Sequence, residues 1–369
     1  MSSSTSPAPN DSTPAVTPSI GAPASAGSLR NLMGGIAISA AFLYFTFRSV
    51  ELDKLWSALR HVDLPLLALA TACFALHFVG RAFRWRVIVN PIRPVTARSL
   101  LRATVVGFAA NNVLPFRLGE LVRAVMLTIT ESVPLGSAVT TVVLVRLLDM
   151  VAMGTMFVIV LIFFPLPARE KHAVLAAIPV YLLALAFLLA LKFREREALA
   201  LLEKMLRPFP AKLRGGVMKL VRAFLPGLES LRSGWELLKA VLITHLAWVG
   251  IFAYNALVIA AFGFHLPWYA GLVLILVVGF AITIPSSPGY LGVYHLAVIA
   301  SLGLFTAVPI SDEAKTAFAV VVHGAQFLLT TAWGVGYFLL SPVRVSDLVR
   351  VIKGSPVVPA APVEPAALS

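Results

Sequence analysis

A cluster of polar and charged side chains interrupts a strongly apolar chain at residues 111 to 123. The segment, NNVLPFRLGELVR, holds two asparagines, a proline, two arginines and a glutamate. Glu120 and Arg123 are three residues apart, so they share one face of a helix that we predict to begin near Gly119. An arginine at membrane depth costs about 2.5 to 3.5 kcal/mol, which some favourable interaction must offset.

Two interpretations of these charges stay open. Glu120 could pair with one arginine while the other extends to the membrane interface. Alternatively, a guanidinium remains free to bind a phosphate through two hydrogen bonds. On the second interpretation Arg117 and Arg123 contact the phosphate, and Glu120 orients them.

Asn111, Asn112 and Pro115 predict a break in the helix at this point. Non-helical backbone at membrane depth requires either a protein interior or an aqueous cavity around it. The two side-chain amides either satisfy the backbone groups that the break frees or contact a ligand.

Two further polar segments lie in apolar surroundings. In VLVRLLDM, Arg146 and Asp149 are three residues apart, which favours an internal ion pair and also allows a wall of the same site. The second segment, PSSPGYLGVYH, would form a tight turn whose following half-helix begins near Gly289 and points its dipole at an anion. His295 could titrate and act as a switch, although a hydrogen-bonded structural role is the commoner one. The candidate site residues of this segment are Pro285, Ser286, Ser287, Pro288, Gly289, Gly292 and His295.

The composition is that of an integral membrane protein. Of 369 residues, 59% are hydrophobic and only 13% are charged, against about 25% charged in soluble domains. The apolar runs approach the roughly 20 residues that a membrane-spanning helix needs. The predicted fold class is therefore an all-α polytopic membrane protein. Six full spans are predicted, at 31 to 48, 64 to 80, 138 to 164, 173 to 191, 239 to 262 and 316 to 340.

Two further apolar stretches, 100 to 118 and 268 to 305, are interrupted by polar residues, and the charge of the loops predicts how they are placed. The basic segments 81 to 102 and 192 to 238 should both be cytoplasmic. Two full spans already lie between them, so 100 to 118 must return to the side from which it came. By the same count, 268 to 305 dips in from the opposite side, or else forms two full spans. Two re-entrant hairpins would give the order span, span, hairpin, span twice, which is typical of inverted-repeat transporters.

The chain is expected to have three parts. Residues 1 to 29 are rich in Ser, Pro, Ala and Thr and form a disordered tail, since they cannot bury a core. Residues 30 to 342 form the membrane domain, and 343 to 369 form a second tail. Both termini are expected in the cytoplasm. Residues 212 to 225 have the pattern of an amphipathic helix lying in the interface.

The chemistry of an enzyme is not indicated. The single cysteine, Cys73, allows no internal disulfide, and the histidines lack metal-ligand spacing. The net charge of +13 is explained by cytoplasmic loops beside anionic lipid, so nucleic acid is not expected as a partner. We expect no cofactor and no metal.

The motifs resemble those of a known family. Asn-x-x-Pro-x-Arg-x-Gly-Glu-x-x-Arg at 112 to 123, Arg-x-x-Asp at 146 to 149 and Pro-x-x-Pro-Gly-x-x-Gly-Val at 285 to 293 resemble the flippase-like transmembrane domain of bacterial lysylphosphatidylglycerol synthases. The family commonly has a glutamate where this chain has Val145, and another where it has His295. Only 27 of the 369 residues follow residue 342, so synthesis of lysyl-lipid is not expected.

The resemblance implies a protein of the bacterial cytoplasmic membrane that moves an anionic lipid, or a lipid-linked head group, between leaflets. A non-transporting scaffold or regulator of an envelope-lipid enzyme is the main alternative. A lipid-modifying transferase that uses Glu120 or His295 as a base ranks third, because no donor-binding motif is present.

Overall fold

The computed structural model describes residues 60, 62–114, 117–164, 177–230, 233–283, 288–290 and 292–352, and every regular element in these ranges is helical. Four of these helices are long and apolar enough to cross a membrane. The chain is therefore an all-α, multi-pass membrane protein, as predicted. The four helices are α3 (Leu64–Val89), α6 (Leu135–Phe163), α11 (Gly234–Ala261) and α14 (Asp312–Leu339).

The other two predicted spans are covered less completely. The span at 31 to 48 lies outside the described residues. The span at 173 to 191 corresponds to α8 (Ala177–Phe193), which has 17 residues and follows an undescribed segment.

Local capping explains where several helices begin. At each of four N-termini a short polar side chain accepts a hydrogen bond from a backbone N–H three residues later, which satisfies one of the donors left over by the first turn. In α11 the cap is followed by a glutamate at the third helical position, the pattern of a capping box. The capping residues are Asp63 of α3, Thr96 of α4 (Ala97–Val113), Ser233 of α11 and Ser311 of α14.

The end of α3 differs from the prediction. The predicted span stops at residue 80, because the arginines that follow were assigned to a cytoplasmic loop. The helix instead continues to Val89, and Arg81 and Arg84 are buried inside the helix bundle. A buried carboxylate, described below, makes this continuation favourable.

The first hairpin consists of α4 and α5 (Gly119–Glu131), which pack against each other. α4 ends at Val113, and the next residue, Leu114, has an extended backbone, as expected for a residue that precedes a proline. The two open ends of the hairpin lie together, since a side-chain N–H of Arg93 donates to the backbone carbonyl of Ser132 at 3.4 Å. The segment is therefore re-entrant as predicted, but its returning arm extends to Glu131 and not to residue 118.

The second hairpin consists of α12 (Ala270–Ala281), the short helix η2 (Pro288–Tyr290) and α13 (Val293–Gly303). With 12 and 11 residues, its arms are about 18 Å and 16 Å long, well short of the roughly 30 Å hydrocarbon core. The rings of Tyr269 and Phe305, at its open ends, are 6.1 Å apart. The structure thus has a re-entrant hairpin here and not two full spans.

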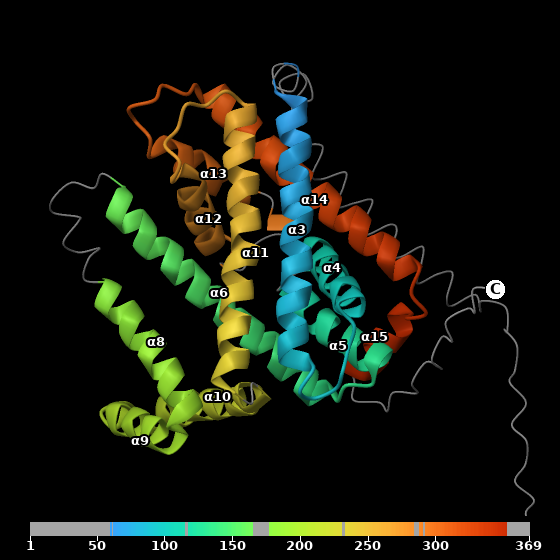
Figure 1. The fold of residues 1–369 in the computed structure, drawn as a ribbon, viewed down its shortest axis with the longest axis vertical. Coiled ribbons are helices and arrows are strands. Elements are labelled where there is room, and N and C mark those ends of the chain that lie inside the picture. Colours follow the sequence, from blue (N-terminus) through green and yellow to red (C-terminus); the bar gives the residue numbers. More distant parts are fainter. Residues whose placement is uncertain are drawn as a thin grey trace, which may run out of the picture.

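The two hairpins enter the bundle from opposite ends (Figure 1). In that view α4 and α5 rise from the lower end, α12 and α13 descend from the upper end, and η2 lies between them. The order of elements along the described chain is the predicted one.

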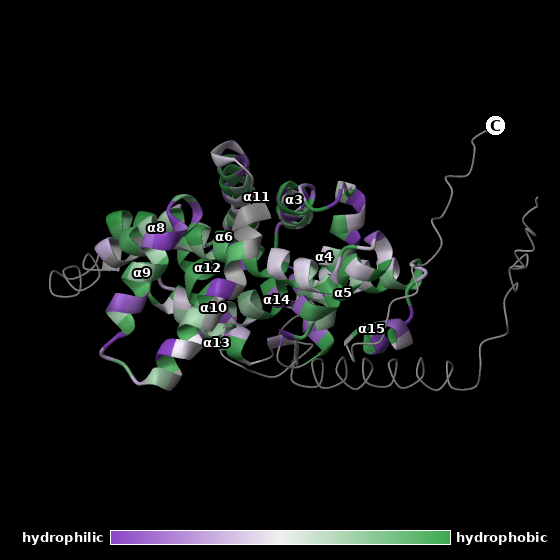
Figure 2. Ribbon diagram, turned by 90° about the horizontal axis from the view of Figure 1, so that it is seen from below, coloured by the Kyte–Doolittle hydropathy of each residue, from purple (hydrophilic) through white to green (hydrophobic). Residues whose placement is uncertain are grey.

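The lower end carries most of the surface helices. The basic segment 192 to 238 contains α9 (Glu195–Leu206) and α10 (Ala211–Ser230), and the predicted amphipathic helix at 212 to 225 lies within α10. α15 (Val345–Ile352) packs against α5 at the same end. Figure 2, seen from below, shows hydrophilic segments on α9 and α15.

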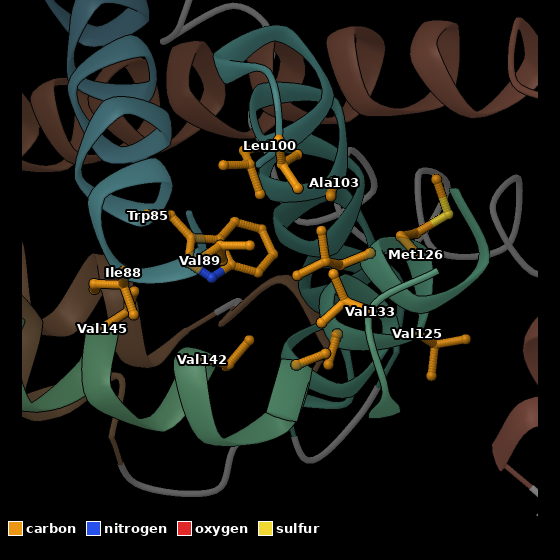
Figure 3. Packing of buried hydrophobic residues seen from close by; sticks show 14 of the residues in the cluster. Trp85, Ile88, Val89, Leu100, Ala103, Val125, Met126, Val133, Val142 and Val145 are labelled. Atoms are coloured by element: carbon orange, nitrogen blue, oxygen red, sulfur yellow. The ribbon is translucent and has the colours of Figure 1, made fainter. Parts of the chain in front are cut away.

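Two apolar clusters fill the bundle. One surrounds the lower part of α3 and the first hairpin, where Trp85, Ile88 and Leu100 are almost fully buried (Figure 3). The other joins the second hairpin to α11 and α14. On the outer face of α3, Leu69, Leu76 and Phe83 recur every seven residues and are exposed, as expected for side chains that face lipid.

Cysteine labelling tests the opposed hairpins. On a Cys73→Ser background, Arg98→Cys marks the first turn of α4 and Trp268→Cys marks the start of the second hairpin, and both native side chains are exposed. We expect a membrane-impermeant maleimide to label the two cysteines from opposite sides of sealed vesicles. Labelling of both from one side would contradict the opposed arrangement.

Candidate functional site

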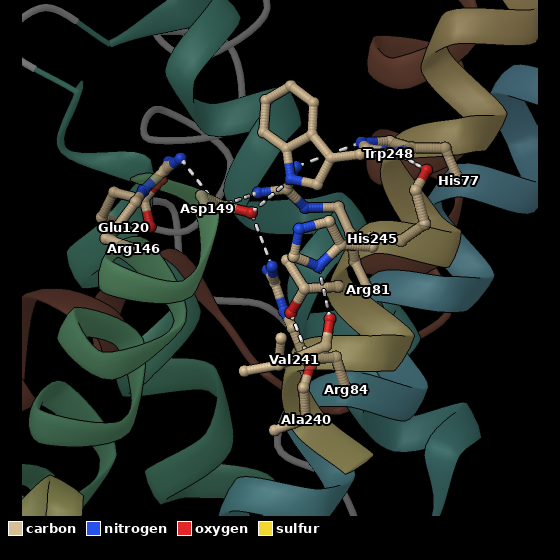
Figure 4. Close-up of polar contacts among 12 residues, drawn as sticks. His77, Arg81, Arg84, Glu120, Arg146, Asp149, Ala240, Val241, His245 and Trp248 are labelled. Carbon is tan, nitrogen blue, oxygen red and sulfur yellow. Dashed lines mark hydrogen bonds and ion pairs between the residues drawn. The ribbon is translucent and has the colours of Figure 1, made fainter. Parts of the chain in front are cut away.

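Asp149 is the centre of a buried polar network between α3, α6 and α11 (Figure 4). Its carboxylate accepts hydrogen bonds from Arg81 at 2.9 Å, Arg84 at 2.5 Å and the indole N–H of Trp248 at 3.0 Å. The side chains of Arg81, Arg84 and Asp149 are only 6%, 1% and 7% exposed. One carboxylate thus faces two guanidinium groups away from solvent.

His77 holds Arg81 in this position. The Nη1 of Arg81 donates to Nε2 of His77 at 3.1 Å, and Nδ1 of His77 donates to the backbone carbonyl of Ala247 at 2.6 Å. α3 and α11 approach closely here, because a Cβ added to Gly80 would lie 2.8 Å from the Cβ of Ala247. The network therefore also locks α3 and α11 together.

The predicted ion pair of Asp149 with Arg146, three residues earlier, is present at 3.6 Å. Asp149 also has two closer partners that the sequence interpretation did not name, Arg81 and Arg84. Neither arginine was a predicted site residue. Their helical spacing from His77 was the available signal, since 77, 81 and 84 fall on one face of a helix.

Glu120 joins two other arginines. Its carboxylate pairs with Arg123 at 3.1 Å and also with Arg146. Arg123 is buried, and its guanidinium lies over the ring of Trp85, 4.8 Å from the centroid. The side chain of Arg146 is 29% exposed. The predicted partnership of Glu120 with Arg123 is present, whereas Glu120 pairs with Arg146 in place of Arg117.

Arg117 lies at the tip of the first hairpin and contacts the tip of the second. Its Nε donates to the hydroxyl of Tyr290 at 3.3 Å, and its guanidinium carbon is 5.8 Å from the ring centroid. Both residues have a left-handed backbone, with φ of 56° for Arg117 and 58° for Tyr290. Such conformations cost of order 1 to 3 kcal/mol in non-glycine residues and occur where the surrounding structure enforces them. Tyr290 was not a predicted site residue.

The two asparagines have structural contacts. The side-chain oxygen of Asn111 accepts from the backbone N–H of Gly119 at 2.8 Å and so supports the start of α5, which begins at the predicted residue. The side-chain N–H of Asn112 donates to the hydroxyl of Thr331 at 2.9 Å and ties the hairpin to α14. Pro115 lies outside the described residues.

The second hairpin differs from its prediction in where its returning helix begins. α13 starts at Val293, after Gly289 and Gly292, whose φ values of 67° and 83° are the left-handed values that glycine adopts readily. The helix therefore begins four residues after Gly289. Pro288 is the first residue of η2. Three further predicted residues, Pro285, Ser286 and Ser287, lie outside the described residues.

His295 belongs to an aromatic group next to this turn. Its ring lies 4.9 Å from the ring of His323, which stacks on Tyr294 at 4.4 Å. His323 also hydrogen-bonds the backbone of Gly289. Among the described residues, the ring contacts of His295 are thus with Tyr294 and His323.

The arginines outnumber the acids around the hairpin tips. We call Arg81, Arg84, Arg117, Arg123 and Arg146, with Glu120 and Asp149, the central cluster; five guanidinium groups against two carboxylates leave a net charge of +3. Among the described residues, no group of His, Cys, Asp and Glu side chains could hold a metal ion. The arrangement is suited to holding an anion.

A comparison with protein families assigns the chain. The family described as "Lysylphosphatidylglycerol synthase TM region" matches residues 32–334. The chain belongs to this family. Membership links the membrane domain to lipid modification or transport. No curated protein and no solved structure matches the chain.

The family match includes all seven residues of the central cluster. It also includes both hairpin tips, where Arg117 meets Tyr290. The resemblance found in the motifs is therefore confirmed over the region that holds the candidate site.

Proposed function

We propose that this protein is a transporter and not an enzyme, and that it moves an anionic lipid or a lipid-linked head group between the leaflets of the bacterial cytoplasmic membrane. Both termini are placed in the cytoplasm in this proposal, because the lower end of the bundle carries the basic segments. The observation that carries the proposal is the net charge of +3 in the central cluster.

Arg117 and Arg146 are the residues that we expect to bind the head group. Within the described residues Arg117 has no carboxylate partner, and its contact is the uncharged phenol of Tyr290. Arg146 shares Glu120 with Arg123 and is partly exposed. A phosphate can accept two hydrogen bonds from a guanidinium, and charged hydrogen bonds are among the strongest in proteins. Arg123, being buried, would act through Glu120 and not by direct contact.

The hairpins explain how a polar group could enter the bundle. Short helices with breaks at their tips, introduced from opposite sides, are the architecture that secondary transporters use for sites within the membrane. The head group would replace Tyr290 on Arg117, while the acyl or prenyl chains stay in the lipid outside the bundle.

Translocation in proteoliposomes tests this function. We expect the wild-type protein to move a head-group-labelled anionic phospholipid faster than a zwitterionic one. Arg117→Gln should lower the anionic rate by on the order of tenfold or more, because a hydrogen bond to a charged group contributes about 1.5 to 3 kcal/mol.

Arg102→Gln is the matched control. Arg102 is an exposed arginine of the same hairpin whose guanidinium lies over the ring of Tyr337, away from the central cluster. Its substitution should leave the rate unchanged. If wild type and a folded Arg117→Gln protein had equal translocation rates, Arg117 would not be part of the binding site. If the wild-type rate were no higher than that of empty liposomes, transport of these lipids would be contradicted.

A further inference from the structure

The net charge of the central cluster indicates how many negative charges the bound head group carries. This inference rests on the proposed function. Asp149 compensates one of its two guanidinium partners, and Glu120 compensates one of its two. Arg117 adds a third uncompensated charge. The sequence contains no charged residue in the undescribed gaps at 115 to 116 and 284 to 287 beside the hairpin tips. A head group with one negative charge would therefore leave a net charge of +2.

Burial strengthens the effect of the excess positive charge in the central cluster. Arg84 and Arg123 are almost completely buried, so water screens their charges poorly. Within the described part of the chain, several of their N–H groups also lack a hydrogen-bond partner, including Nε and Nη2 of Arg84 and Nε of Arg123. The positive potential of these groups consequently extends to the neighbouring positions that a ligand can reach.

Arg117 and Arg146 are those positions. Arg146 meets the first hairpin at the start of α5, because its partner Glu120 is three residues after Arg117 in the chain. Two partly exposed guanidinium groups repel each other unless an anion lies between them. The partner that Tyr290 offers to Arg117 is a phenol hydroxyl and not a carboxylate.

We propose that the head group is a phosphomonoester or a diphosphate, with close to two or more negative charges, and not a single phosphodiester. A terminal phosphate carries about −1.5 to −2 at pH 7 and presents three acceptor oxygens. It can bridge Arg117 and Arg146 with separate oxygens. A phosphodiester carries one charge and two free oxygens, so it neutralises less of the central cluster.

A pair of lipids isolates this charge difference. Dihexanoyl phosphatidate and dihexanoyl phosphatidylmethanol share the same chains and differ by one methyl ester, which removes the second ionisation. Binding to the purified full-length protein in phosphatidylcholine nanodiscs can be measured by the ligand-induced shift in thermal unfolding. We expect phosphatidate to bind on the order of tenfold more tightly, which corresponds to about 1.4 kcal/mol. Farnesyl diphosphate should bind at least as tightly as phosphatidate, and inorganic phosphate and pyrophosphate show whether the head group alone suffices.

Substitutions test whether the preference for phosphatidate arises at Arg117 and Arg146. Arg117→Gln and Arg146→Gln should each reduce the ratio of the two affinities, whereas Arg102→Gln should preserve it.

The pH dependence of binding by the wild-type protein tests the same preference if these variants fail to fold. Between pH 8 and pH 5 the phosphatidate loses its second charge, whose pKa is near 6. The preference of the wild-type protein for phosphatidate over phosphatidylmethanol should therefore decrease over this range. Any change in the binding of phosphatidylmethanol itself reports titration of the protein and serves as the control.

Equal or tighter binding of phosphatidylmethanol would overturn the proposal, as would a preference that Arg117→Gln and Arg146→Gln leave intact. The outcomes also separate this inference from the proposed function. If a phosphodiester lipid is translocated and monoesters are not preferred, the transport function is supported and the proposed substrate class is contradicted. If monoesters are preferred in binding but no lipid is translocated, the binding site is supported and the transport function is contradicted.

Discussion

Replacing Asp149 with asparagine is expected to lower the free energy of unfolding by about 3 to 5 kcal/mol. The substitution removes the charge shared by Arg81 and Arg84 and leaves two buried guanidinium groups without a counter-charge. The midpoint of thermal unfolding of the purified protein in detergent would measure the loss.

Two further variants give this prediction its controls. Asp312→Asn removes an exposed carboxylate that pairs with Lys315 at 3.0 Å, and it should cost no more than about 1 kcal/mol. Adding Arg84→Gln to Asp149→Asn removes one uncompensated charge and should recover part of the stability. If Asp149→Asn were no more harmful than Asp312→Asn, the network would not stabilise the fold.

Replacing Gly119 with alanine is expected to reduce both stability and translocation. Gly119 is the first residue of α5, and a Cβ there would lie 2.5 Å from the side-chain oxygen of Asn111, with the backbone carbonyl of Gly107 closer still. Overpacking of this kind typically costs about 1 to 3 kcal/mol. Because Arg117 lies only two residues before Gly119, displacement of α5 would also move the proposed head-group contact.

Gly136→Ala is the comparison for this variant. Gly136 is in the first turn of the next helix, α6, and a Cβ there would have no neighbour within 4 Å. Alanine should be neutral or stabilising by up to about 1 kcal/mol, since it has the higher helix propensity. Thermal unfolding and the proteoliposome rate should therefore separate the two variants. Equal behaviour would mean that the close approach of α4 and α5 is not required.

The arrangement of the membrane domain could be predicted from the sequence because charge and hydrophobicity act locally. Counting basic segments predicted that 100 to 118 is re-entrant and left 268 to 305 as either a re-entrant hairpin or two full spans. The structure has a hairpin in both places. The same rule misplaced the end of α3. It treats every arginine as a loop residue, whereas Arg81 and Arg84 both pair with one acid inside the bundle.

The pairing of the charges could not be predicted in the same way. Arg81 and Arg84 are 68 and 65 residues from Asp149 in the sequence, and nothing local connects them. Arg117 and Tyr290 are separated by 173 residues. Spacing identified the local partnerships of Glu120 with Arg123 and of Arg146 with Asp149. Three-dimensional packing decided the other partners.

The meeting of two opposed hairpins has a consequence for membrane voltage. Because Arg117 contacts Tyr290 between the two ends of the bundle, an anion bound there has already crossed part of the transmembrane field (Figure 1). Each elementary charge moved across the full membrane changes the energy by about 2.3 kcal/mol per 100 mV. If the proposed transport of a multiply charged head group holds, a potential that is negative inside would drive it outward, and transport in that direction would need no coupled ion.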